Sequence, residues 1–211
     1  MKKGTIVFLI LLGSFCAIGQ GTEKFDISLK RMHLKFQKPA DLNISSYVGR
    51  SYMAHSSNPM GLSFDQILNT DNDDLQVGFI FFDNDTTNLL GTPKYITPED
   101  NYIVEINSQI DTSSNYVEVD GQLELKSRRN IMDTTNVHLL KGDSLKNTGA
   151  EVAGFFEVPI EFPYRKKYKL CSAYFMNKKE RGVVYMYYFY NEGFPIKKYL
   201  KNAVHLLTFK D

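Results

Sequence analysis

The run Val183-Val184-Tyr185-Met186-Tyr187-Tyr188-Phe189-Tyr190 decides the fold, because every position in it is apolar or aromatic. Such a run is typical of a central strand that has neighbours on both edges and is covered on both faces. A second strand-like run precedes it at residues 168–176, and the polar segment between them, residues 177–182, ends in glycine. The two runs therefore predict a β-hairpin.

An amphipathic helix is expected directly after the hairpin. Beyond Pro195, apolar residues recur at positions 196, 199, 200, 203, 204 and 207. This spacing places the apolar side chains on one face of a helix and leaves lysines on the other. The apolar face needs a partner, so we expect the helix to lie on the sheet. We predict an α+β fold, in which an antiparallel β-sheet carries a C-terminal amphipathic helix in a sandwich-like arrangement.

The remaining elements are expected from local patterns. Residues 26–38 alternate loosely between apolar and polar side chains, which predicts a short strand or a pair of strands. Residues 63–66 have the form of a capping box and predict a short helix. Residues 75–82 predict a strand covered on both faces, 97–100 predict the start of a helix, and 126–150 predict mostly loop. Further strands are expected over residues 117–119, 122–125 and 152–162.

The C-terminal third resembles the Mog1/PsbP-like domains. The resemblance is carried by the turn Lys178-Lys179-Glu180-Arg181-Gly182, the run from Val183 to Tyr190 and the helix after Pro195. It implies an α/β/α-like sandwich around an antiparallel sheet, in a family whose bacterial members are mostly exported and have no known activity. It implies no functional residue, and the polar stretch 126–150 departs from the compact form of that family.

The N-terminus has the anatomy of a cleaved secretory signal. Lys2 and Lys3 precede an uncharged apolar run that ends in Ala17-Ile18-Gly19. The run is shorter than the roughly 20 apolar residues that a membrane-spanning helix needs, and its small residues fit a signal peptidase. We predict a signal peptide over residues 1–19 and a single domain over residues 20–211. We expect export to the periplasm or the extracellular space, association with the envelope, and no transmembrane segment.

The two cysteines raise separate questions. Cys16 lies where a lipoprotein signal places its lipidated cysteine, although Phe15 before it is larger than the residue that such signals prefer. Lipidation at Cys16 therefore stays open beside cleavage after Gly19. After cleavage Cys171 is the only thiol, so the domain cannot form an internal disulfide. Its place in a predicted strand indicates a buried and inert thiol.

Motifs of catalysis and metal binding give little support to an enzyme. The sequence holds no G-x-S-x-G, P-loop, dinucleotide-binding glycine motif or C-x-x-C, and its four histidines lack metal-site spacing. Asp83 and Asp85 begin a run with oxygen side chains at alternate positions, as a calcium loop does. The sixth and twelfth positions are Asn88 and Lys94, where an EF-hand needs Gly and Glu. We expect turns there, with Asp83 and Asp85 as the candidate metal ligands, and no cofactor.

The charge is nearly neutral in sum but divided along the chain. The whole chain holds 25 Lys and Arg and 24 Asp and Glu. Residues 20–163 hold 12 of the cations and 21 of the anions, a net charge of −9. Residues 164–211 hold 11 cations and 3 anions, a net of +8, and eight of the 13 tyrosines lie between Tyr164 and Tyr199. Cations beside aromatic rings can bind anions or sugars, but large side chains in a sheet are more often core, with the charged turns simply solvated. The asymmetry can steer an anionic partner, or it can be neutralised when the two parts pack together.

These patterns favour an exported, non-enzymatic binding or accessory protein with a Tyr- and Lys-rich C-terminal surface. Its expected partner is an anionic or glycan component of the envelope, or another protein, and its exported destination argues against nucleic acid. The alternatives are an exported hydrolase with dispersed catalytic residues and a subunit of a cell-envelope complex. The candidate binding residues are Arg165, Lys166, Lys167, Lys169, Lys178, Lys179 and Arg181.

Overall fold

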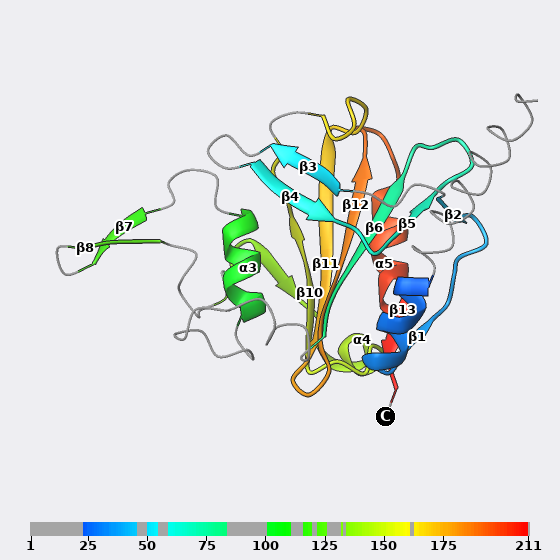
Figure 1. Cartoon of the computed structure of the whole chain (residues 1–211), viewed down its shortest axis with the longest axis horizontal. Helices are drawn as coiled ribbons and strands as arrows, with labels where there is room; N and C mark the ends of the chain where they lie inside the picture. Colours follow the sequence, from blue (N-terminus) through cyan, green and yellow to red (C-terminus); the bar gives the residue numbers. More distant parts are fainter. Residues whose placement is uncertain are drawn as a thin grey trace, which may run out of the picture.

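The computed structural model describes residues 23–45, 50–54, 59–83, 101–110, 116–119, 122–125, 132, 134–160 and 163–210. The predicted hairpin lies at its centre (Figure 1). Strand β11 (Leu170–Lys178) pairs antiparallel with β12 (Gly182–Tyr190), and every residue of β12 is buried. The prediction of a central, doubly covered strand is thus confirmed. The signal peptide and Cys16 lie outside the described residues.

The main sheet is antiparallel and has seven strands in the order β2-β5-β6-β12-β11-β10-β9. Its other strands are β2 (Asn43–Ile44), β5 (Gln66–Asn69), β6 (Gln76–Asp83), β9 (Val137–Leu139) and β10 (Val152–Glu157). Three two-stranded sheets accompany it: β1 (Leu34–Phe36) with β13 (Leu207–Phe209), β3 (Arg50–Ala54) with β4 (Pro59–Ser63), and β7 (Tyr116–Val119) with β8 (Gln122–Leu125). The helices are residues 23–31, α3 (Asn101–Ile110), α4 (Gly142–Lys146) and α5 (Ile196–Leu206).

Helices cover both faces of the main sheet, which gives the sandwich-like α+β fold that the sequence predicts (Figure 1). On one face, Phe79 of β6 packs with Phe25 of the first helix and with Val204 of α5 in one apolar cluster. On the other face, Ile80 of β6 joins a second cluster that includes Ile106 of α3. The alternation of Phe79 and Ile80 between the two clusters follows from the two-residue period of a strand.

The segment 26–38 is only partly the strand that we expect. Residues 23–31 form a helix, and only β1 is a strand. Phe25, Leu29 and Met32 recur at steps of four and three, so they lie on one helical face and contribute to the core. The loose alternation in the sequence concealed this helical period.

The capping-box prediction at residues 63–66 is wrong, because that segment is extended. Gln66 pairs with Phe79 at the start of β5. The backbone N–H of Asp65 donates to the Phe79 carbonyl at 2.8 Å, and its Oδ2 accepts from the Phe81 N–H at 2.9 Å. These bonds to β6 fix the extended backbone, so tertiary pairing overrides the local helix signal.

The other predictions have mixed outcomes. Strands β7 and β8 and helix α3 are confirmed, while the helix start at 97–100 lies outside the described residues. The expected loop over 126–150 contains β9 and α4, and the expected strand over 152–162 ends at Glu157. Beyond Glu157 one bond to β11 remains, from the Val158 N–H to the Cys171 carbonyl at 2.9 Å.

Candidate functional site

The candidate binding residues fall into two groups at opposite ends of β11. Arg165 to Lys169 precede the strand, Lys178 is its last residue, and Lys179 and Arg181 lie in the turn that follows. Nine strand residues span about 26 Å at roughly 3.3 Å per step. The two groups therefore cannot contact one small ligand together.

Two of the four cations in the first group, Arg165 and Lys167, contact the start of β6 and the acidic turn before it. Lys167 Nζ donates to Asp73 Oδ2 at 2.7 Å, Tyr168 Oη donates to Asp73 Oδ1 at 2.8 Å, and Arg165 Nη1 donates to Gln76 Oε1 at 2.6 Å. Desolvation acts to raise the pKa of Asp73, but the bonds from Lys167 and Tyr168 and the nearby cations hold it below its ordinary value. The opposite charges of these two segments thus neutralise one another, which is one of the two outcomes that the charge division allows.

The Tyr-rich surface expected from the sequence does not exist. Of the eight tyrosines between Tyr164 and Tyr199, seven are buried and Tyr199 is half-buried. Tyr164, for example, stacks on Phe189 with ring centroids 3.8 Å apart. The strands that carry these residues are covered on both faces, so the rings belong to the core.

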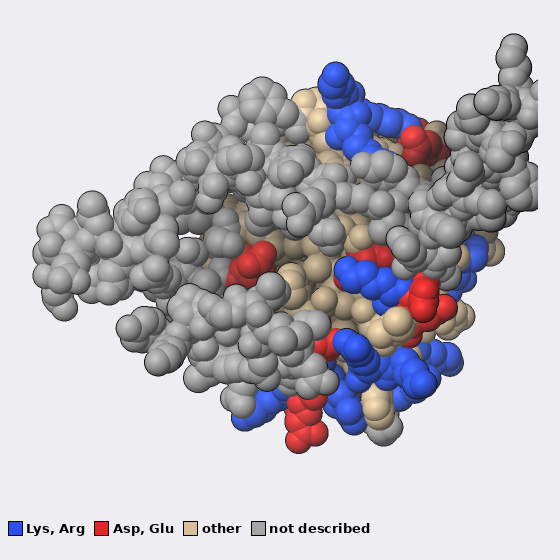
Figure 2. All heavy atoms as spheres, in the orientation of Figure 1, with Lys and Arg blue, Asp and Glu red and all other residues tan. Residues whose placement is uncertain are grey.

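The second group joins cations from three other segments at one end of the sheet. Figure 2 shows Lys and Arg atoms gathered at the lower end of the molecule, where Figure 1 places the β11–β12 turn, α4 and the C-terminus. We call these residues the basic end. They are Lys30, Arg31, Lys141, Lys146, Lys178, Lys179, Arg181 and Lys210.

Three contacts hold the segments of the basic end together. Arg31 Nη1 lies 3.6 Å from Oδ2 of Asp83. Asp83 is the last residue of β6 and pairs with Gly182, the first residue of β12. Lys178 Nζ lies 5.9 Å from the ring centroid of Phe209, just before Lys210. In turn, the Phe209 N–H donates to the carbonyl of Thr148, after α4, at 2.8 Å. Four segments far apart in sequence therefore meet at one end of the sheet.

The basic end keeps an excess of positive charge. Its eight cations are accompanied by four described carboxylates in the same segments and strand ends, so these residues carry a net charge of +4. Sequence reasoning missed five of the eight cations, because nothing in the sequence indicates which distant turns share one end of a sheet. The four carboxylates are Asp83, Asp143, Glu151 and Glu180.

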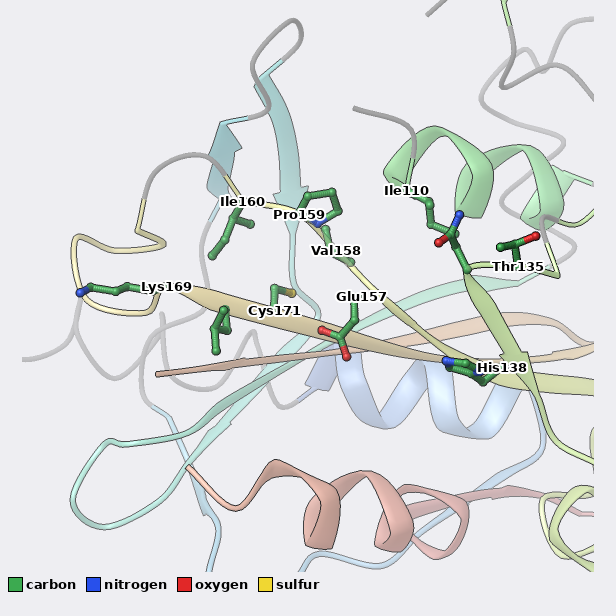
Figure 3. A pocket seen from close by; sticks show the side chains of 11 residues that line it. Ile110, Thr135, His138, Glu157, Val158, Pro159, Ile160, Lys169 and Cys171 are labelled. Carbon is green, nitrogen blue, oxygen red and sulfur yellow. The ribbon is translucent and has the colours of Figure 1, made fainter. Parts of the chain in front are cut away.

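A cleft of about 530 Å³ lies at the other end of β11 and β10 (Figure 3). Glu157 and His138 line it on one side of the sheet, with Cys171 on the other side of the same strands. Ser172 Oγ donates to the Glu157 carboxylate at 2.9 Å and lies 2.9 Å from Tyr190 Oη, so this carboxylate is tied to the sheet.

Cys171 is confirmed as a buried thiol. Burial, together with the charge of Glu157, raises the pKa of Cys171 well above its ordinary value. The thiolate is the nucleophilic form of cysteine, so this residue is held in its unreactive form.

Only one of the two metal candidates, Asp83, lies among the described residues. Asp83 is buried beside Arg31, and Asp85 lies outside the described residues. No three His, Cys, Asp or Glu side chains among the described residues converge as a metal site would require. Within the same part of the chain, no helix has the length and apolar character to cross a bilayer. Comparison with protein families, curated proteins and solved structures finds no match to this chain, so the Mog1/PsbP-like resemblance stays a prediction.

Proposed function

We propose that the chain is an exported, non-enzymatic binding or accessory protein that holds an anionic component of the cell envelope at its basic end. The observation that carries this proposal is the convergence of eight Lys and Arg side chains from four separate segments. Like charges held close together repel one another, and a bound polyanion relieves that repulsion. The arrangement therefore favours an anionic partner.

The two halves of the predicted site have different roles in this proposal. Arg165 and Lys167 are used in contacts with Gln76 and Asp73, so they support the fold. The turn from Lys178 to Arg181 supplies part of the basic end. The export signal expected at residues 1–19 supports an envelope component over nucleic acid as the polyanion.

Charge reversal at two matched places tests the proposal. The basic-end variant is Lys30→Glu/Lys146→Glu/Lys210→Glu, and all three side chains are exposed. The control variant, Lys166→Glu/Lys169→Glu/Lys197→Glu, changes the net charge equally with exposed residues at the opposite end of the sheet. We expect the wild type and the control to bind immobilised dextran sulfate at low salt, and the basic-end variant to elute at much lower salt.

Two results would contradict the proposal. One is equal loss of binding in both variants, which would mean that only net charge matters. The other is a wild-type chain that dextran sulfate does not retain. Circular dichroism and urea unfolding of both variants show whether the fold is intact.

A further inference from the structure

We infer that the polyanion met by the basic end is a membrane surface rich in anionic lipid headgroups, with the strands of the main sheet steeply inclined to the bilayer. This inference rests on the proposed function and specifies its ligand. It follows from the shape of the charged region, the charge of the opposite end and the distance between the two.

The shape of the basic end suits a flat array of headgroups. Its cations lie in turns and at element ends: in the last turn of the first helix, around α4, at the end of β11 and in the turn to β12, and after β13. The charges therefore cap the end of the sheet and do not follow one strand or one groove. Basic residues spread over such a cap can reach many anionic headgroups at once.

The opposite end of the sheet does not share this charge. Its turns and the start of α5 hold six cations and six carboxylates, a net charge of 0. Two of these cations, Lys167 and Lys198, are already paired with Asp73 and Asp41. The six cations are residues 165, 166, 167, 169, 197 and 198, and the six carboxylates are Asp41, Asp71, Asp73, Asp74, Glu157 and Glu192.

Because salt screens electrostatic attraction over a short distance, only one end of the sheet can interact with the membrane charge at a time. At about 0.1 M salt the screening length is about 10 Å, whereas β11 alone separates the ends by about 26 Å. With the basic end on the headgroups, the opposite end lies beyond the reach of the membrane charge. The strands run from one end of the sheet to the other, so their direction must be steeply inclined to the plane of the bilayer.

Vesicle sedimentation tests the ligand. The wild-type chain should bind vesicles of equal parts phosphatidylglycerol and phosphatidylcholine at about 0.1 M salt, and pure phosphatidylcholine vesicles far less. Each Lys or Arg near an anionic leaflet strengthens binding about fivefold, so the basic-end variant should bind at least about 100-fold more weakly. The control variant should stay within about fivefold of wild type, because its substitutions lie beyond the screening length.

The outcomes separate this inference from the proposed function. Binding to dextran sulfate in solution without binding to the anionic vesicles would overturn the membrane inference and leave the proposed function standing. Failure to bind either polyanion would overturn both. Equal binding to neutral and anionic vesicles would also overturn the inference, because the attraction would then not depend on headgroup charge.

An environment-sensitive fluorophore tests the orientation. We would attach it at Ser144→Cys, in α4 at the basic end, and separately at Asn72→Cys, at the opposite end; both positions are exposed. A Cys16→Ser background and the burial of Cys171 restrict labelling to the new cysteine. Anionic vesicles should shift the emission of the label at position 144 alone, and an equal or reversed response would overturn the orientation.

Discussion

Replacing Gln76 with methionine should destabilise the fold through the loss of one buried polar bridge. Gln76 is fully buried at the start of β6. Its Nε2 donates to Tyr164 Oη at 3.0 Å, and its Oε1 accepts from Arg165 Nη1 at 2.6 Å. The bridge therefore fastens the 164–168 turn to the sheet.

The expected loss is about 3 kcal/mol of unfolding free energy. A neutral hydrogen bond contributes about 1 kcal/mol, and one to a charged group about 1.5–3 kcal/mol. Methionine has nearly the length of glutamine, so the substitution removes both bonds and leaves little cavity. The loss is large for a domain whose total stability is typically about 5–15 kcal/mol.

Urea unfolding followed by far-ultraviolet circular dichroism measures this loss. With a slope of about 2 kcal/mol per molar urea, the midpoint should fall by about 1.5 M. The matched control is Gln37→Met, at an exposed position, which should change stability by less than about 0.5 kcal/mol. A double variant with Tyr164→Phe should lose less than the sum of the two single changes, because both remove the same bond. A Gln76→Met loss below about 1 kcal/mol would refute the reasoning.

Three further predictions concern buried groups and a turn. Burial raises the pKa of Glu105, and this effect outweighs the hydrogen bond from Gln109, which lowers the pKa. The carboxyl of the folded chain therefore keeps its proton to higher pH than that of the unfolded chain. The free energy of unfolding should then fall as pH rises through the pKa of the folded state. Glu105→Gln should therefore raise the melting temperature at about pH 8 more than at about pH 4. An equal rise at the two pH values would contradict this. Gly182→Ala should cost about 3 kcal/mol in urea unfolding, because φ is +112° and a Cβ would lie 2.1 Å from the Phe82 carbonyl oxygen; unchanged stability would show that the turn relaxes freely. Cys171 should react with a thiol reagent only in urea, and rapid modification of the native chain would disprove its burial.

The centre of the fold could be predicted from sequence because its residues carry unambiguous local signals. β12 is apolar at every position, and α5 has a regular helical spacing. The edges could not be predicted in the same way. β5 carries a helix-capping pattern and becomes extended only because β6 pairs with it. The first helix was misread because Phe25, the first residue of its apolar face, lies before the stretch that looked strand-like.

The candidate site was predictable only in part, for a topological reason. The turn from Lys178 to Arg181 stands out as a basic segment on its own. Lys30, Lys146 and Lys210 are scattered in sequence, and they meet only because β1 pairs with β13 and α4 lies beside that pair. No local sequence pattern indicates that these three residues lie close together in the fold.

The order of strands also has a consequence for the timing of folding. β12 occupies the middle of the sheet, yet it comes from residues 182–190 of a chain of 211. Until this segment has been made, β6 can pair only with β5, and β1 has no partner until β13 has been made. Long-range strand pairing of this kind is slow, because the chain must close large loops before any contact forms. The seven-stranded sheet can therefore close only after the segment that forms β12 has been synthesised, so the order of the strands along the chain delays completion of the centre of the sheet.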